Sequence, residues 1–185
     1  TMGPEPEPTE TADPALEGMT KQNLTFAADC PARVGVHVPD DWTSNTSGSS
    51  FAAFPTTGGF DGPRLSVMCS TGFASTPSES VSSTQKYQFS DAATEVVAEH
   101  TGQVGPGYSW VYEANLGPEE TMSSFSDEAT SAVGASVSYP ISGKLYDVTV
   151  TYYFTTGDTK VRDQAVAALT NLQVEGTTVS SPADW

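Results

Sequence analysis

The chain has 185 residues, 37% of them hydrophobic, and its 23 Asp and Glu residues outnumber 7 Lys and Arg residues to give a formal net charge of −16. That charge repels nucleic acid and anionic lipid headgroups, so no nucleic-acid partner is expected. No run of about 18 apolar residues occurs, so the sequence offers no transmembrane helix.

The N-terminal region is predicted to be an acidic Pro/Glu-rich flexible spacer over residues 1–21. Residues 1–20 carry five acidic residues and four prolines but no basic residue, a composition that cannot bury enough apolar surface to offset its ordering entropy. Because the chain opens at Thr1 without a signal peptide, we expect that a preceding segment has been removed. A single domain is predicted over residues 22–176, followed by a polar, fraying tail over residues 177–185.

Alternating apolar residues predict four strands in the first half of the chain. In the second of them, Val34, Val36 and Val38 are expected to face the core, while His37 faces solvent. The Ser/Thr/Gly-rich segment between the second and third strands is predicted to be a turn, at residues 43–50. The four predicted strands cover residues 23–28, 33–39, 50–56 and 64–70.

A polar loop over residues 71–84 is predicted to precede a helix. Ser90 is a suitable N-cap for that helix, and Gly102 is a suitable terminator. Between them, one helix face is expected to carry Ala93, Val96, Val97 and His100, which recur at helical spacing.

The second half predicts three strands, 108–116, 130–141 and 144–155, and then a helix from Asp158 or Thr159 through Leu172. The Ser-Gly pair at 142–143 predicts a hairpin between the last two strands. The fold class is therefore α+β: a mostly antiparallel sheet of about six to seven strands, packed by two main helices.

The two cysteines, Cys30 and Cys69, each border a strand-like run and do not form a C-x-x-C pair. An even count in an exported chain predicts one disulfide. Two buried free thiols are the alternative. Metal binding is not expected, because four ligands at short paired spacings are lacking.

No catalytic residue, cofactor or metal site is predicted. His37 and His100 are the only imidazoles, and ordinary solvated or packing roles suit both. Ser83 and Lys86 match S-x-x-K without its companion motifs. The adjacent carboxylate pairs lie in turn-like sequence and are expected to be solvated; they include Asp40–Asp41, Glu119–Glu120 and Asp127–Glu128.

Exposed aromatic residues are the better functional candidates, since such side chains dominate binding energetics. Tyr153 lies on the face of its strand opposite the predicted core. Trp185 ends a polar tail and is able to dock back onto the fold. These two residues form the candidate interaction surface.

Two segments resemble a known family. VHVPDDW at residues 36–42 and FTTGDTKVRDQAVAALTNLQV at residues 154–174 resemble the Mog1/PsbP-like fold, and more narrowly the actinobacterial LpqN-like envelope lipoproteins. The resemblance covers about residues 22–175. It implies a non-enzymatic binding or extrinsic subunit, tethered by a lipidated cysteine upstream of Thr1 rather than by a transmembrane helix.

The expected function is that of an exported accessory subunit of a membrane protein complex on the outer face of the bacterial cytoplasmic membrane. A respiratory electron-transport assembly is the candidate complex. The alternative is an envelope protein that binds a lipid or a glycan. A hydrolase that uses His37 or His100 is the least favoured hypothesis.

Overall fold

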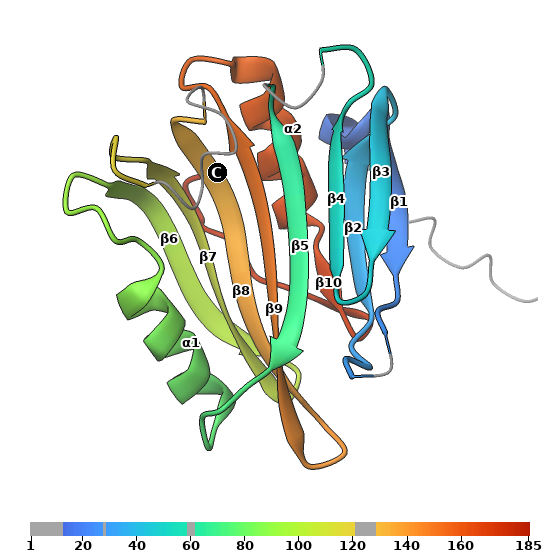
Figure 1. The fold of residues 1–185 in the computed structure, drawn as a ribbon, viewed down its shortest axis with the longest axis vertical. Coiled ribbons are helices and arrows are strands. Elements are labelled where there is room, and N and C mark those ends of the chain that lie inside the picture. Colours follow the sequence, from blue (N-terminus) through green and yellow to red (C-terminus); the bar gives the residue numbers. More distant parts are fainter. Residues whose placement is uncertain (1–12, 28, 59–61, 121–128) are drawn as a thin grey trace, which may run out of the picture.

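The computed structural model describes residues 13–27, 29–58, 62–120 and 129–185, and in them two antiparallel sheets and two helices (Figure 1). This confirms the predicted α+β fold. The larger sheet runs, in spatial order, through β3 (Trp42–Ser47), β4 (Ser50–Pro55), β5 (Arg64–Thr71), β9 (Lys144–Phe154), β8 (Ser131–Ile141), β7 (Gly107–Asn115) and β6 (Glu95–Val104). The smaller sheet consists of β1 (Met19–Leu24), β2 (Val34–Pro39), β10 (Gln173–Val174) and β11 (Thr177–Thr178).

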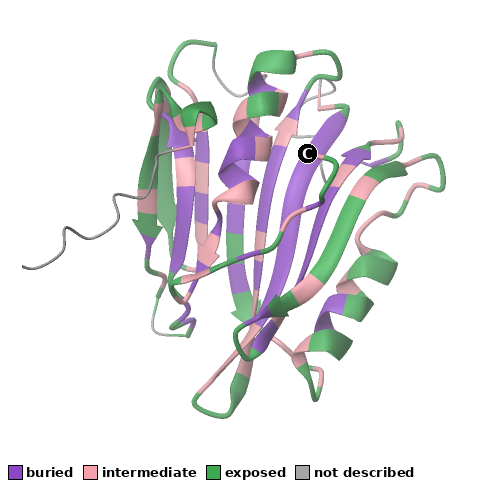
Figure 2. Cartoon of the chain, turned by 180° about the vertical axis from the view of Figure 1, so that it is seen from behind, coloured by how far each residue is buried: buried purple, intermediate pink, exposed green. Residues whose placement is uncertain are grey.

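The helices are α1 (Pro77–Tyr87) and α2 (Thr159–Thr170), and a short 3-10 turn, η1 (Pro14–Leu16), precedes β1. Helix α2 packs against β2, β8 and β9, and in Figure 2 it lies in front of the larger sheet. Helix α1 packs against β7 and β8.

Alternate residues of the long strands enter two separate hydrophobic cores. In β7, Val111 belongs to the main core, whereas Trp110 and Tyr112 belong to the second core. Because successive side chains of a strand point to opposite faces, the two cores lie on opposite sides of the larger sheet. The main core contains residues of α2 and the smaller sheet, and the second core contains Val81 of α1.

The smaller sheet joins the larger one through β2 and β9. Val34, Val36 and Val38 are buried in the main core, as the alternating pattern predicts. The hydroxyl of Tyr152 on β9 donates a hydrogen bond to the backbone carbonyl of His37. This bond and the shared core fix the two sheets to each other.

The helix predicted from Ser90 to Gly102 is wrong, because that segment forms the edge strand β6. The apolar residues recur at helical spacing by coincidence. Val96 and Val97 are β-branched residues that favour strands, and both are exposed rather than buried on a helix face. Pairing with β7 from Glu95 to Val104, interrupted only by a register shift between Val96 and Ala98, decides the conformation.

The actual helix, α1, starts inside the segment predicted to be a polar loop. Thr76 is its N-cap and accepts a hydrogen bond from the backbone N–H of Glu79 at 3.3 Å, and Pro77 occupies the first turn. Thr76 and Glu79 have the spacing of a capping box. Ser80 and Val81 are its only buried residues, so no apolar stripe marks it in the sequence.

Strand β3 occupies most of the segment predicted to be a turn over residues 43–50. It pairs with β4 from Trp42 to Ser47, and the chain reverses at Gly48, where φ is +56°. All of its residues after Trp42 are exposed, so no apolar alternation could indicate a strand. The hairpin predicted at Ser142–Gly143 is present, and both of these residues have positive φ, which suits a tight turn between β8 and β9.

Both ends of the domain extend beyond the predicted bounds. Residues 1–12 of the predicted spacer lie outside the described residues, but residues 13–21 form η1 and the start of β1, which pairs with β2. The prediction of a fraying tail over residues 177–185 is also wrong. Val179 is buried in the main core, and its N–H donates to the carbonyl of Leu172 at 2.8 Å.

Cys30 and Cys69 form a disulfide whose Cα atoms are 6.2 Å apart. Both residues are buried in the main core, where Cys69 on β5 meets the segment that leads into β2. The bond therefore ties the smaller sheet to the larger sheet covalently.

Replacing both cysteines with Ala should lower the free energy of unfolding by about 4 kcal/mol, because the bond closes a loop with a sequence separation of 39 residues. Urea unfolding of the oxidised protein and of the double variant measures the difference. Reducing agent should shift the unmodified protein toward the variant and leave the variant unchanged. An unchanged midpoint after reduction would contradict the disulfide.

Candidate interaction surfaces

A groove of about 660 Å³ crosses the outer side of α2. Trp185 contributes one wall, and residues around η1 contribute the other. It is lined by Asp13, Ala15, Glu17, Lys160, Arg162, Asp163, Gln164, Val166, Ala167, Thr170 and Trp185.

Hydrogen bonds at η1 build the N-terminal wall of this groove. Asp13 caps η1 by accepting from the N–H of Ala15 at 3.0 Å. Its other carboxylate oxygen accepts from the side-chain amide of Asn171, at the C-terminal end of α2, at 3.2 Å. The first described residues are thereby held against the last helix.

Trp185 forms the opposite wall and packs partly against the main core. Its indole N–H is buried and has no hydrogen-bond partner among the residues that the structure describes. Trp185 is thus a half-buried aromatic residue at the border of the groove, and it docks back onto the fold rather than fraying with the predicted tail.

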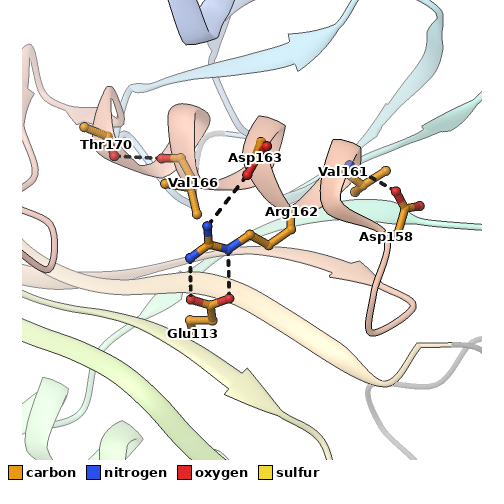
Figure 3. A network of polar contacts seen from close by, with 7 residues as sticks. All are labelled: Glu113, Asp158, Val161, Arg162, Asp163, Val166 and Thr170. Atoms are coloured by element: carbon orange, nitrogen blue, oxygen red, sulfur yellow. Dashed lines mark hydrogen bonds and ion pairs between the residues drawn. The ribbon is translucent and has the colours of Figure 1, made fainter. Parts of the chain in front are cut away.

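A bidentate ion pair fixes α2 on the larger sheet beside the groove (Figure 3). Arg162 donates from Nε and Nη2 to the two carboxylate oxygens of Glu113 on β7, each at 3.0 Å. Nη1 lies 3.7 Å from Asp163. The hydrogen bonds to Glu113 raise the pKa of Arg162. The charge of Arg162, which lines the groove, is therefore engaged in a structural contact.

A second cavity, of about 360 Å³, lies over the smaller sheet. It is lined by Asn23, Leu24, Thr25, Arg33, Val34, Gly35, Gln173, Glu175 and Gly176. Lys21 lies close to Gly35, where a Cβ would come within 2.7 Å of the lysine side chain, and its Nζ donates to Gln173 at 2.6 Å. Glu175 accepts from the backbone N–H of Arg33 at 2.9 Å.

Tyr153 and Trp185 lie on opposite sides of the larger sheet. Tyr153 is half-buried against the second core, and Trp185 packs against the main core. Burial raises the pKa of Tyr153, and a hydrogen bond with Thr151 acts in the opposite direction. The structure does not bring the two candidate residues together.

The two histidines also lie apart. His37 is on β2 of the smaller sheet, and His100 is exposed on β6, the far edge of the larger sheet. Nδ1 of His37 is buried and lacks a partner among the described residues. Burial lowers the pKa of His37, Lys21 lowers it further, and Asp13 opposes them.

Two carboxylates have structural partners, and the expectation that the Glu119–Glu120 pair is solvated is wrong for Glu120, which is buried. Glu120 accepts from the N–H of Asp91 at 2.7 Å and from the hydroxyl of Thr94 at 2.9 Å, which joins the loop before β6 to the loop after β7. Asp147 accepts from the hydroxyl of Ser80 at 2.7 Å. The pair Asp127–Glu128 lies outside the described residues.

Neither a metal-ligand cluster nor a membrane-crossing helix occurs in the described part of the chain. No three His, Cys, Asp or Glu residues there gather as ligands. Neither helix in those ranges is long and apolar enough to cross a bilayer.

Comparison with known proteins identifies the fold. No family model and no curated protein matches the chain. Among solved structures, LpqN from Mycobacterium tuberculosis, which is involved in cell envelope biogenesis, matches with a TM-score of 0.58 and 11% identity, over 84% of this chain and 91% of LpqN. The chain has the fold of LpqN.

Two further solved structures match more weakly. The cyanobacterial PsbP of Synechocystis sp. PCC 6803 has a TM-score of 0.47 at 12% identity, over 93% of this chain and 99% of its own. The Ran-binding protein Mog1p of Saccharomyces cerevisiae has a TM-score of 0.44 at 12% identity, over 84% of this chain and 95% of its own. The match to LpqN confirms the predicted resemblance to the LpqN-like form of the Mog1/PsbP-like fold.

The Arg162–Glu113 pair should stabilise the fold by about 1–2 kcal/mol, because it is bidentate and Glu113 is mostly buried. A double-mutant cycle with Arg162→Met and Glu113→Gln, followed by urea unfolding, measures this coupling energy. The pair of Arg162 with the exposed Asp163 is the control, and Asp163→Asn should change stability by less than about 0.5 kcal/mol. Equal effects from both carboxylates would contradict the assignment.

His37 should make the fold less stable in mild acid. Its folded-state pKa is lowered from 6.5, so its contribution to stability is fully present above about pH 6.5 and is lost as the pH falls below that value. The free energy of unfolding should therefore drop less between pH 8 and about 5.5 in His37→Gln than in the unmodified protein. His100→Gln, at a histidine exposed on β6, is the control for the His-to-Gln substitution itself. The opposite ranking would contradict the role of His37.

Proposed function

We propose that this chain is a non-enzymatic accessory subunit that docks on a membrane protein complex at the outer face of the bacterial cytoplasmic membrane. A respiratory electron-transport assembly is our candidate complex. The lipid anchor expected ahead of Thr1 belongs to the same proposal. The acidic Pro/Glu-rich composition of the first residues supports a tether of this kind.

The observation that carries the proposal is how the reactive side chains are engaged. Glu113, Glu120 and Asp147 each accept structural hydrogen bonds that join separate segments of the fold. The two histidines lie in different sheets and cannot share a site. Such an arrangement suits a scaffold that presents surfaces more than it suits a site of general acid–base chemistry.

The disulfide supports the proposed location outside the cytoplasm, and the net charge supports a partner with a basic face. A disulfide buried in the main core suits an oxidising compartment outside the cytoplasm. The net charge of −16 favours a partner with a basic face and disfavours direct adsorption to anionic lipid. Trp185 and the accessible part of Tyr153 remain our candidates for aromatic contacts with such a partner.

The groove over α2 supports the second candidate function, an envelope protein that binds a lipid or a glycan. Its volume of about 660 Å³ lies in the range of small-molecule sites, and Trp185 gives it an aromatic wall. Native mass spectrometry of protein purified without detergent distinguishes the two functions, because only the second requires a bound small molecule.

Membranes solubilised in mild detergent test the leading proposal. Immunoprecipitation of the full-length gene product should recover a membrane protein in fixed proportion, and metabolic labelling with a fatty acid should mark the chain if it is lipid-anchored. Trp185→Ala should reduce the recovery several-fold. Tyr87→Ala, at an exposed aromatic residue on α1, is the matched control and should leave recovery unchanged. Recovery only as a free monomer would count against the accessory role.

A further inference from the structure

Strand β6 is an open edge of the larger sheet. It is the last strand in the spatial order, and β7 is the strand hydrogen-bonded to it. Its ten residues are mostly exposed, and the exposed colour follows β6 along the sheet in Figure 2. An edge of this length offers a row of backbone donors and acceptors to another strand.

The positions of these open backbone groups follow from the hairpin between β6 and β7. Val104 pairs with Gly107 across a two-residue turn, so these two residues exchange backbone hydrogen bonds. Because the pattern alternates along an antiparallel strand, the next residues with N–H and C=O turned away from β7 are Gln103, Thr101 and Glu99.

A β-bulge, one of the features that hinder the addition of a strand to a sheet edge, occurs only near the start of β6. A register shift lies between Val96 and Ala98, and such bulges disturb strand addition. From Ala98 to Val104 the register with β7 is regular, and the segment contains neither Pro nor Lys. The open groups therefore lie on a stretch that pairs in regular register with β7 and is interrupted by neither a bulge nor a proline.

The charge of this edge indicates the kind of strand that fits it. Glu95 and Glu99 are exposed on β6, and the strand contains no Lys or Arg. Glu99 is held in place, because it accepts from the indole N–H of Trp110 at 2.9 Å and lies 3.4 Å from the side-chain amide of Gln85. A cation on an added strand would meet a carboxylate that is already positioned.

The opposite edge of the sheet lacks these properties. Strand β3 has six residues and contains no charged side chain. A second copy of the chain is also a poor occupant for β6, because two chains that each carry a charge of −16 repel each other. A basic segment of another protein is favoured over both alternatives.

We propose that β6 binds an extended basic segment of a partner protein as an added strand, paired along Glu99–Gln103. Backbone hydrogen bonds to the open groups of Glu99, Thr101 and Gln103 supply the affinity, and Lys or Arg beside Glu99 supplies the selectivity. The identity of the partner as a membrane protein rests on the proposed function, but the strand addition itself does not.

A synthetic peptide of alternating Val and Lys tests the strand addition without knowledge of the partner. It should bind the intact chain and slow amide hydrogen exchange at Glu99, Thr101 and Gln103. The same peptide with alternate N-methylated amides keeps its charge but cannot extend the sheet, so it should bind at least about tenfold more weakly. Equal binding of the two peptides, or exchange protection elsewhere, would overturn the proposal.

Two proline variants of the edge strands test the strand addition by changing the protein instead of the peptide. Thr101→Pro removes an outward N–H, a change that an edge strand tolerates, and it should weaken peptide binding at least about tenfold. Thr46→Pro is the matched control, because Thr46 lies next to the β3–β4 turn on the opposite edge, and it should leave binding unchanged. Circular dichroism shows whether each variant is folded, and the N-methylated peptide tests the inference if Thr101→Pro does not fold.

Immunoprecipitation separates this inference from the accessory role. If the unmodified chain and Thr101→Pro recover a membrane protein equally well and the unmethylated peptide fails to protect the amides of Glu99, Thr101 and Gln103, the strand addition is wrong and the accessory role stands. If the unmodified chain recovers none while the peptide protects the amides of Glu99, Thr101 and Gln103, the accessory role is wrong and the strand addition stands.

Discussion

The antiparallel pairing of β8 with β9 is the contact on which both cores depend. It runs without interruption from Ser131 opposite Phe154 to Ile141 opposite Lys144. Strand β5 adds to one side of the pair and β7 adds to the other. Alternate side chains then enter opposite cores, so a slip of one residue in this register would exchange the two faces of the sheet. Helices α1 and α2 both pack against β8 and rely on the same register.

The parts of the fold that sequence reasoning predicts are those that bury a regular pattern. Val34, Val36 and Val38 alternate because β2 has one face in the main core, and Ser142–Gly143 marks a turn that requires positive φ. The pattern fails where an element is exposed. The edge strands β3 and β6 and the helix α1 bury few residues, so pairing and capping set their structure rather than an apolar face.

The surfaces could be predicted only in part. Trp185 was identifiable as a large aromatic residue in a polar tail, but the groove beside it needs η1, α2 and the C-terminus together. The hydrogen bond from Asn171 to Asp13 spans a sequence separation of 158 residues, and no local pattern reports such a contact. Tyr153 shows the same limit, because its accessibility depends on the second core, which the sequence pattern did not reveal.

The smaller sheet influences the order in which the chain folds. Strand β2, near the start of the chain, pairs with β10, near its end, and β10 pairs in turn with β11. Contacts between segments so far apart in the sequence form slowly, because the long loop between them must close first. Strand β2 therefore gains its second neighbour, and the smaller sheet its full width, only after residues 173–178 have been synthesised.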